Sequence, residues 1–175
     1  MRDDISLDLV HWTKGESDEE AFKTLCSIIA ELKIFGSSGS IKGLYTCVCF
    51  TEAPTSKFHL QLNRYSSFGI KVSKNWLYKL GGRPVIYQSN SEYSFLIEEQ
   101  RWRHVRYEPV NDSPIDFTWE REWRIKKKIL ELEEFQFSIV LPDESWRERI
   151  YSDYAHLFTL DYELFWFPRF DHEIV

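Results

Sequence analysis

Apolar residues recur along the chain with two different spacings, and these spacings predict a mixture of strands and helices. Alternation of apolar and polar positions predicts strands, because successive side chains of a strand point to opposite faces. Apolar spacings of three and four predict helices. Strands are expected at 6–12, 44–54, 68–73, 83–89, 102–110, 114–127, 135–144 and 163–170, and helices at 15–36, 74–82, 94–100 and 143–158. Residues 57–67 are compatible with a short helix or an irregular segment.

The first helix carries the clearest boundary signals. Ser17 is suited to cap its N-terminus, and Glu20 follows at the spacing of a capping box. An apolar stripe continues from there, and Gly36 is expected to end the helix.

The order of these elements predicts an α+β fold. Strands dominate the second half of the chain with short connections between them, which favours antiparallel pairing. The helices are then expected to pack on strongly curved or split sheets. A length of 175 residues suits one domain, so residues 1–175 are expected to form a single unit.

The stretch TWEREWRI, residues 118–125, places charged and aromatic side chains in alternation. In a continuous strand it would have one charged face and one core face. The charged face would carry Glu120, Glu122 and Arg124, and the core face Trp119, Trp123 and Ile125 together with Arg121. The sequence therefore predicts two carboxylates and a guanidinium that point in the same direction.

Composition narrows the class of protein. The formal net charge is −6, which argues against a global basic field for nucleic acid but leaves a local basic patch open. The chain begins MRDDISLDLV, which lacks the basic start and apolar run of a signal peptide. Its apolar stretches are short of the ~20 residues that span a membrane. A cytoplasmic protein without membrane contact is therefore expected.

The cysteines and glycines exclude several kinds of site. Cys26, Cys47 and Cys49 are an odd set without a secretory signal, so a disulfide framework is not expected. Cys47 and Cys49 lack a second ligand pair at zinc spacing, and we expect small buried thiols and no metal site. No glycine-rich turn joins a strand to a helix, so neither a P-loop nor a dinucleotide fingerprint is available.

Two candidate sites each have a plain structural alternative. His11 lies at the end of the first expected strand, where it can pack as a half-buried side chain or offer a ring nitrogen to a ligand. Glu120 and Glu122 can stabilise a cationic transition state or bind a sugar hydroxyl. They can equally belong to a solvated face, or Glu122 and Arg124 can form a buried structural pair.

Three short motifs, in this order, resemble those of ADP-ribosyltransferases of the His-Tyr-Glu type. LVHWTKG, residues 9–15, resembles the first motif, with a histidine followed two residues later by a hydroxyl residue. KGLYTCVCF, residues 42–50, resembles the second motif, with a tyrosine near a glycine. EREW, residues 120–123, resembles the third motif, in which a strand glutamate drives catalysis.

A second resemblance covers roughly residues 8–126. The run CVCFTEAP, FGIKVSKNWLYKLGGRPVIY and EREWRI is similar to the abortive phage-resistance family called AbiGi. This likeness is closer in sequence and implies a component of a phage-defence or toxin-antitoxin system.

The first resemblance implies a fold of split antiparallel β-sheets with flanking helices, which grip NAD in the cleft between them. NAD would be a substrate of this site. His11 would hold the adenosine ribose with Thr13 nearby, and Tyr45 would stack on nicotinamide, a position for which Phe50 is a second candidate.

The same resemblance implies the catalytic roles. Glu122 would bond the nicotinamide ribose and stabilise the oxocarbenium ion as nicotinamide leaves, and Glu120 would orient the acceptor.

Two functions are therefore expected from different classes. The first is an NAD-dependent ADP-ribosyltransferase that modifies a protein or nucleic-acid acceptor. The alternative is a non-catalytic antitoxin or adaptor on the same fold, which binds a protein partner encoded in a defence operon. If His11 and Glu122 face one open pocket the first is favoured, and if aromatic side chains fill that cleft the second is favoured.

Overall fold

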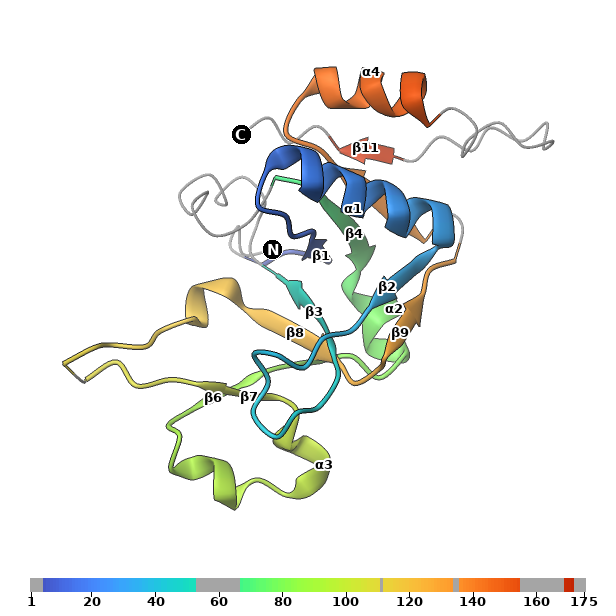
Figure 1. The fold of residues 1–175 in the computed structure, drawn as a ribbon. Coiled ribbons are helices and arrows are strands. Elements are labelled where there is room, and N and C mark those ends of the chain that lie inside the picture. The colour runs from blue at the N-terminus through green and yellow to red at the C-terminus, as the bar shows by residue number, and fades with distance from the viewer. Residues whose placement is uncertain (1–4, 53–66, 111, 134–135, 155–168, 172–175) are drawn as a thin grey trace.

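The computed structural model describes residues 5–52, 67–110, 112–133, 136–154 and 169–171 (Figure 1). The helices of these residues are α1 (Asp18–Glu31), α2 (Lys74–Lys79), α3 (Glu98–Arg101) and α4 (Glu144–Asp153), with 3₁₀ turns η2 (Glu92–Phe95) and η3 (Thr118–Glu120). The strands are β1 (Asp8–Trp12), β2 (Lys33–Phe35), β3 (Val48–Thr51), β4 (Gly69–Ser73), β5 (Arg83–Pro84), β6 (Ile86–Gln88), β7 (His104–Arg106), β8 (Glu122–Ile125), β9 (Ile129–Glu131), β10 (Phe137–Val140) and β11 (Arg169–Asp171).

A seven-stranded sheet forms the centre of the structure, in the order β11-β10-β4-β1-β3-β8-β5. Its strands pair antiparallel, apart from the parallel pair β10–β11. Two smaller sheets pair β2 with β9 and β6 with β7. The expected α+β class is confirmed.

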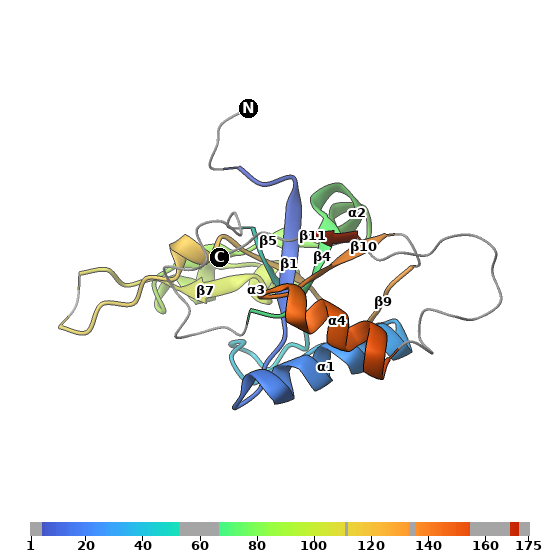
Figure 2. The same ribbon diagram turned by 90° about the horizontal axis from the view of Figure 1, so that it is seen from above.

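Helix α1 covers one face of the central sheet and forms the main hydrophobic core with it. Its inward side chains pack with those of β1, β3, β4, β8 and β10. The fully enclosed members include Leu9, Phe22, Leu25, Phe50, Phe68, Ile70, Ile125 and Ile139. Helix α4 lies beside α1 (Figures 1 and 2), where Arg149 donates two hydrogen bonds to Glu19 at 2.6 and 2.8 Å.

The start of α1 follows its capping signal, but its end does not follow Gly36. The Ser17 side chain accepts a hydrogen bond from the Glu20 amide, as predicted. The helix stops at Glu31 because Leu32 adopts a left-handed conformation with φ of 51°. Residues 33–35 then leave as β2 to pair with β9, a contact with residues about a hundred positions away that local spacing does not reveal.

The predicted strand 114–127 is wrong in its first half. Thr118–Glu120 form the turn η3, and Arg121 has a left-handed backbone with φ of 45°, so regular strand geometry begins only at Glu122. The alternation between faces is interrupted at Arg121. Trp119 therefore packs with Val10, Trp12 and Val140, away from the core that contains Trp123.

Other boundaries also differ from the expectations. The strand expected at 83–89 divides into β5 and β6, which belong to different sheets, and the strand expected at 44–54 has its regular pairing at Val48–Thr51. Residues 94–100 form parts of η2 and α3. The open assignment of 57–67 and most of the expected strand at 163–170 lie outside the described residues.

The cysteines are thiols in the interior, as expected. Cys26 and Cys47 are buried and Cys49 is half-buried. Burial raises the pKa of Cys26 and of Cys47 to about 11, and it also raises the pKa of Cys49. Among the helices that the structure describes, none combines the length and apolar character needed to cross a membrane.

Trp123 should be a major contributor to stability. It is 8% exposed in the main core, and its indole Nε1 donates to Glu52 Oε2 at 2.7 Å. Replacing Trp123 with Ala should lower the free energy of unfolding by about 3–5 kcal/mol, because it leaves a cavity in the core and removes the hydrogen bond to Glu52 Oε2. Urea denaturation measures this.

Phe95→Ala is the matched aromatic control, since Phe95 is 82% exposed and its removal should change the free energy by less than about 0.5 kcal/mol. Equal effects of the two substitutions would contradict the core assignment of Trp123.

Candidate functional site

The three motif-bearing segments come together in the central sheet. His11 lies on β1, the tyrosine motif leads into β3, and Glu122 begins β8. These strands are immediate neighbours in the order β1-β3-β8, although 35 residues separate the end of β1 from the start of β3, and 70 separate β3 from β8. The sheet therefore brings the three motif-bearing segments, which are distant in sequence, into one region of the molecule.

The contact between β1 and β3 is short. Among the residues that the structure describes, a single register pair, Val10 with Thr51, joins them, whereas β1 pairs with β4 along its whole length. Beside that pair the His11 ring reaches across, and its Nδ1 lies 2.9 Å from the carbonyl oxygen of Cys49. The sheet thus divides into a β11-β10-β4-β1 part and a β3-β8-β5 part, with the imidazole at the division.

His11 and Thr13 are both held by backbone carbonyls. Burial of the ring lowers the pKa of His11, with the Cys49 carbonyl acting in the opposite direction, and the lowered pKa favours the neutral imidazole. In that form Nδ1–H donates to Cys49 and Nε2 is an acceptor. The Thr13 hydroxyl is buried and donates to the carbonyl of Phe68 at 3.1 Å, so it serves the fold.

The two rings considered for stacking have different environments. Tyr45 lies before β3, half-buried against Ile41 and Cys47, and the ammonium of Lys126 is 4.8 Å from the centre of its ring. Phe50 is 2% exposed in the main core, with the His11 ring at its edge, 5.7 Å between centres. Phe50 is therefore a core residue, and Tyr45 is the ring nearer to the surface.

Glu122 is paired with Arg124 from the same face of β8. Arg124 Nε donates to Glu122 Oε1 at 2.7 Å and its Nη2 donates to Oε2 at 3.1 Å. The remaining Nη1 donates to the carbonyls of Trp102 and His104, both at 3.0 Å. The side chains are only 12% and 6% exposed, so this is a buried bidentate ion pair that connects β8 to the segment around β7.

The surroundings of Glu122 add a phenol and a thiol. Its backbone N–H donates to Tyr87 Oη at 3.0 Å, and burial raises the pKa of Tyr87 to about 12. Burial is also the main cause of the raised pKa of Cys49, and the nearby Glu122 carboxylate adds to it. Both groups stay protonated at neutral pH, and the Cys49 thiol bonds the Glu122 carboxylate.

The register separates Glu122 from His11. Residues directly opposite in antiparallel strands point to the same face, so Val10, Thr51 and Glu122 form one row. His11 follows Val10 and therefore projects from the opposite face, next to Phe50. Within the described residues no hydrogen bond or ion pair joins His11 to Glu122. The structure brings their strands together but not their side chains.

Glu120 does not continue the strand face of Glu122. It is 9% exposed and lies in the turn η3, and the left-handed Arg121 stands between the two residues in the chain. The expected face shared by both glutamates is therefore wrong, whereas Glu122 and Arg124 do share one. In addition to its burial, both glutamate carboxylates nevertheless raise the pKa of Tyr87.

Sequence reasoning missed Glu52, which follows the Thr51–Glu122 register pair at the end of β3. Its Oε1 accepts from Lys74 at 2.6 Å, and its Oε2 accepts from the Trp123 indole. Glu52 thereby ties β3 to β8 and to the start of α2. An acid directly after an apolar strand is the only local signal, and it does not identify either partner.

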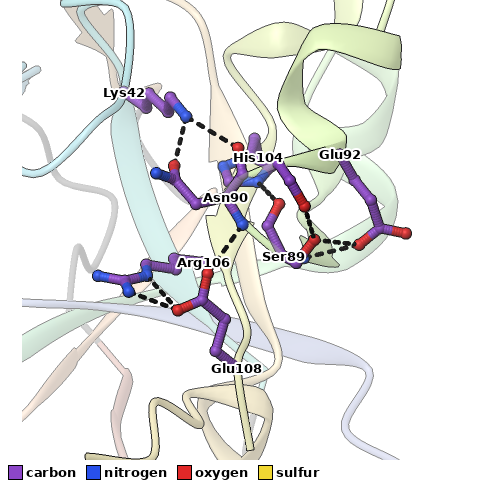
Figure 3. A network of polar contacts seen from close by, with 8 residues as sticks. Lys42, Ser89, Asn90, Glu92, His104, Arg106 and Glu108 are labelled. Atoms are coloured by element: carbon purple, nitrogen blue, oxygen red, sulfur yellow. Dashed lines mark hydrogen bonds and ion pairs between the residues drawn. The ribbon is translucent and has the colours of Figure 1, made fainter. Parts of the chain in front are cut away.

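A polar network fixes the segment that contains β6 and β7 (Figure 3). Lys42 bonds the side chain and the carbonyl of Asn90, whose amide donates to Glu108. His104 contributes its Nε2, 3.2 Å from the Ser89 carbonyl. This network joins the loop before β3 to the β6–β7 pair, the same segment that Arg124 reaches from the other side.

Comparison of the chain with protein-family models, with curated proteins and with solved structures finds no match in any of the three.

The ion pair should be more important for stability than its position at a strand end suggests. Replacing Arg124 with Met should cost about 3–5 kcal/mol, because the Glu122 carboxylate would remain buried without its partner. The double variant Arg124→Met, Glu122→Leu should recover part of that loss. Urea denaturation of the two single variants and the double variant measures the coupling. Strictly additive effects would show that the pair contributes nothing beyond its separate members.

Stability should fall as the pH is lowered from 7 toward 5. Burial lowers the pKa of His104, Lys42 and Arg124 lower it further, and the carbonyls of Ser89 and Gln88 raise it. Burial lowers the pKa of His11 as well. In the unfolded chain the pKa of each histidine is near 6.5, so as the pH falls the unfolded chain binds protons before the folded chain does. The stability of the folded state is therefore greatest above that pH and falls below it.

Denaturation at pH 7.5 and at pH 5.0 measures this difference. His104→Asn and His11→Asn should each reduce the difference in the free energy of unfolding between the two pH values. The control Arg106→Gln should not reduce it, since arginine does not titrate in this range. If both histidine variants keep the pH dependence of the wild type, the loss of stability at low pH does not come from His11 and His104.

Proposed function

We propose that the chain is an ADP-ribosyltransferase-like protein of a phage-defence or toxin-antitoxin system, and that it binds NAD at the division between β1 and β3. The observation that carries this proposal is the adjacency of β1, β3 and β8, the strands on or beside which the three motifs lie. The single register pair between β1 and β3 supports it further, since it corresponds to the split sheet that the resemblance implies.

The ion pair with Arg124 is compatible with a catalytic role for Glu122. An ionised carboxylate has about four lone-pair sites, and the two bonds from Arg124 use two of them. The Cys49 thiol bonds the same carboxylate, which leaves about one lone-pair site for a ribose hydroxyl. Arg124 would act as a positioning residue that holds the carboxylate in one orientation, and Glu122 would stabilise the sugar cation as nicotinamide leaves.

A second candidate is a non-catalytic antitoxin or adaptor on the same scaffold. The observation that favours it is the register, which puts His11 and Glu122 on opposite faces of the sheet. In this alternative the Glu122–Arg124 pair is a structural lock between β8 and the β7 segment. The protein would then bind its partner without any use of NAD.

NAD binding and nicotinamide release separate the two candidates. If the proposal holds, millimolar NAD should raise the melting temperature, because a ligand that binds only the folded state stabilises it. Glu122→Gln should keep the NAD-dependent rise while it lowers nicotinamide release by about 10²-fold or more. The melting temperature of each variant is compared with and without NAD. This comparison within one variant is unaffected by the destabilisation that loss of the ion pair causes.

Glu131→Gln is the matched control, since Glu131 is an exposed strand carboxylate outside the site. It should change neither quantity. If NAD leaves the melting temperature of the wild type unchanged and no nicotinamide is released with protein, DNA or RNA acceptors, catalysis is excluded. Glu122→Gln would then report only a structural loss, as the second candidate requires.

A further inference from the structure

A cluster of positive charge lies beside Tyr45, on a protein that is acidic as a whole. Lys126, Lys127 and Lys128 form the exposed turn between β8 and β9. This turn packs against the loop that connects β2 to β3. The Gly36 amide donates to the Lys128 carbonyl at 2.8 Å, and a Cβ on Gly36 would lie 2.4 Å from the Lys127 carbonyl oxygen. Glycine is required there because the two backbones touch.

The three ammonium groups are available. Some other exposed lysines have polar partners, such as Lys23 with Glu19 and Lys42 with Asn90. By contrast, no carboxylate of the described residues pairs with Lys126, Lys127 or Lys128. Three adjacent unneutralised cations in a chain of net charge −6 produce a local field of the sign opposite to the whole protein.

An aromatic ring and an apolar side chain border these cations. The Lys126 ammonium lies 4.8 Å from the centre of the Tyr45 ring. Leu44, the residue before Tyr45, is 81% exposed and has a left-handed backbone with φ of 59°. Exposed serines, Ser37 and Ser40, occupy the same loop and offer hydroxyl donors. The cations and the ring are therefore in contact, and an exposed apolar residue is next to the ring in the chain.

We propose that this surface, Lys126–Lys128 with Leu44 and Tyr45, binds single-stranded nucleic acid. The lysines would neutralise successive phosphates, and a base would stack on Tyr45 beside Leu44, taking the place of the Lys126 ammonium as that ammonium moves to a phosphate. Proteins that bind single strands combine these two elements, a cationic track and an aromatic platform. The proposal requires no NAD and stands independently of the proposed function.

Single strands fit this surface better than a duplex or a membrane. In a duplex the base faces are covered by stacking, so Tyr45 and Leu44 would have no partner. A lipid surface would be attracted by the lysines alone, at about 1 kcal/mol each. The half-buried Tyr45 ring, held against Ile41 and Cys47, is positioned to stack rather than to insert.

Fluorescence anisotropy with a labelled 12-nucleotide single strand tests the proposal, without NAD and over a range of salt concentrations. The triple variant Lys126→Gln, Lys127→Gln, Lys128→Gln should weaken binding by at least about tenfold and reduce the salt slope by about 0.7 per lysine. The control triple Lys14→Gln, Lys23→Gln, Lys79→Gln removes the same charge elsewhere on the exposed surface and should leave both quantities nearly unchanged.

The role of the bases is tested with an abasic strand of the same length, which has the phosphates but cannot stack. It should bind at least about tenfold more weakly than the normal strand. Equal binding of abasic and normal strands, equal loss in both lysine triples, or tighter binding to a duplex or to vesicles of anionic phospholipid would overturn the proposal. Circular dichroism of each variant confirms that the comparison is made between folded proteins.

Discussion

The buried ion pair between Arg124 and Glu122 is the interaction on which the rest of the structure depends. A guanidinium that is almost enclosed must have all of its donors satisfied, because an unpaired buried charge is strongly destabilising. Arg124 donates two bonds to Glu122 on its own strand and one each to the carbonyls of Trp102 and His104. It therefore holds β8 and the β7 segment together, and with Tyr87, which accepts from the Glu122 amide, it joins two sheets that share no strand.

The division of the central sheet has a physical cause of the same kind. Where β1 and β3 separate, the carbonyl of Cys49 needs a donor other than the neighbouring strand. The imidazole of His11 lies at hydrogen-bonding distance from it and can supply that donor. The side chain of a strand residue thus donates the hydrogen bond that a backbone amide would otherwise donate. The two parts of the sheet can therefore separate without leaving this carbonyl unsatisfied. This contact explains the structural role of a histidine near the end of β1.

Local signals in the sequence predicted local structure well. The cap at Ser17, the apolar stripe of α1 and the shared face of Glu122 and Arg124 each depend on residues a few positions apart. The errors arose where distant contacts decide the outcome. Leu32 and Arg121 adopt left-handed conformations that no glycine announces, and both positions redirect the chain toward partners far away in sequence. The same holds for the candidate site residues. Only the fold reveals that Phe50 lies in the core and that Glu52 joins Lys74 to Trp123.

The cysteines give the native state a chemical signature. A thiol reacts as its thiolate, and all three thiols have raised pKa values because the folded chain encloses them. Cys49 packs against the cluster of Ile41, Cys47 and Trp102, so its full exposure requires β3 to separate from the segment that carries Trp102. The rate at which an alkylating reagent modifies Cys49 should therefore measure how often that cluster opens. The thiol makes the contact between β3 and the segment before β7 accessible to chemistry as well as to structure.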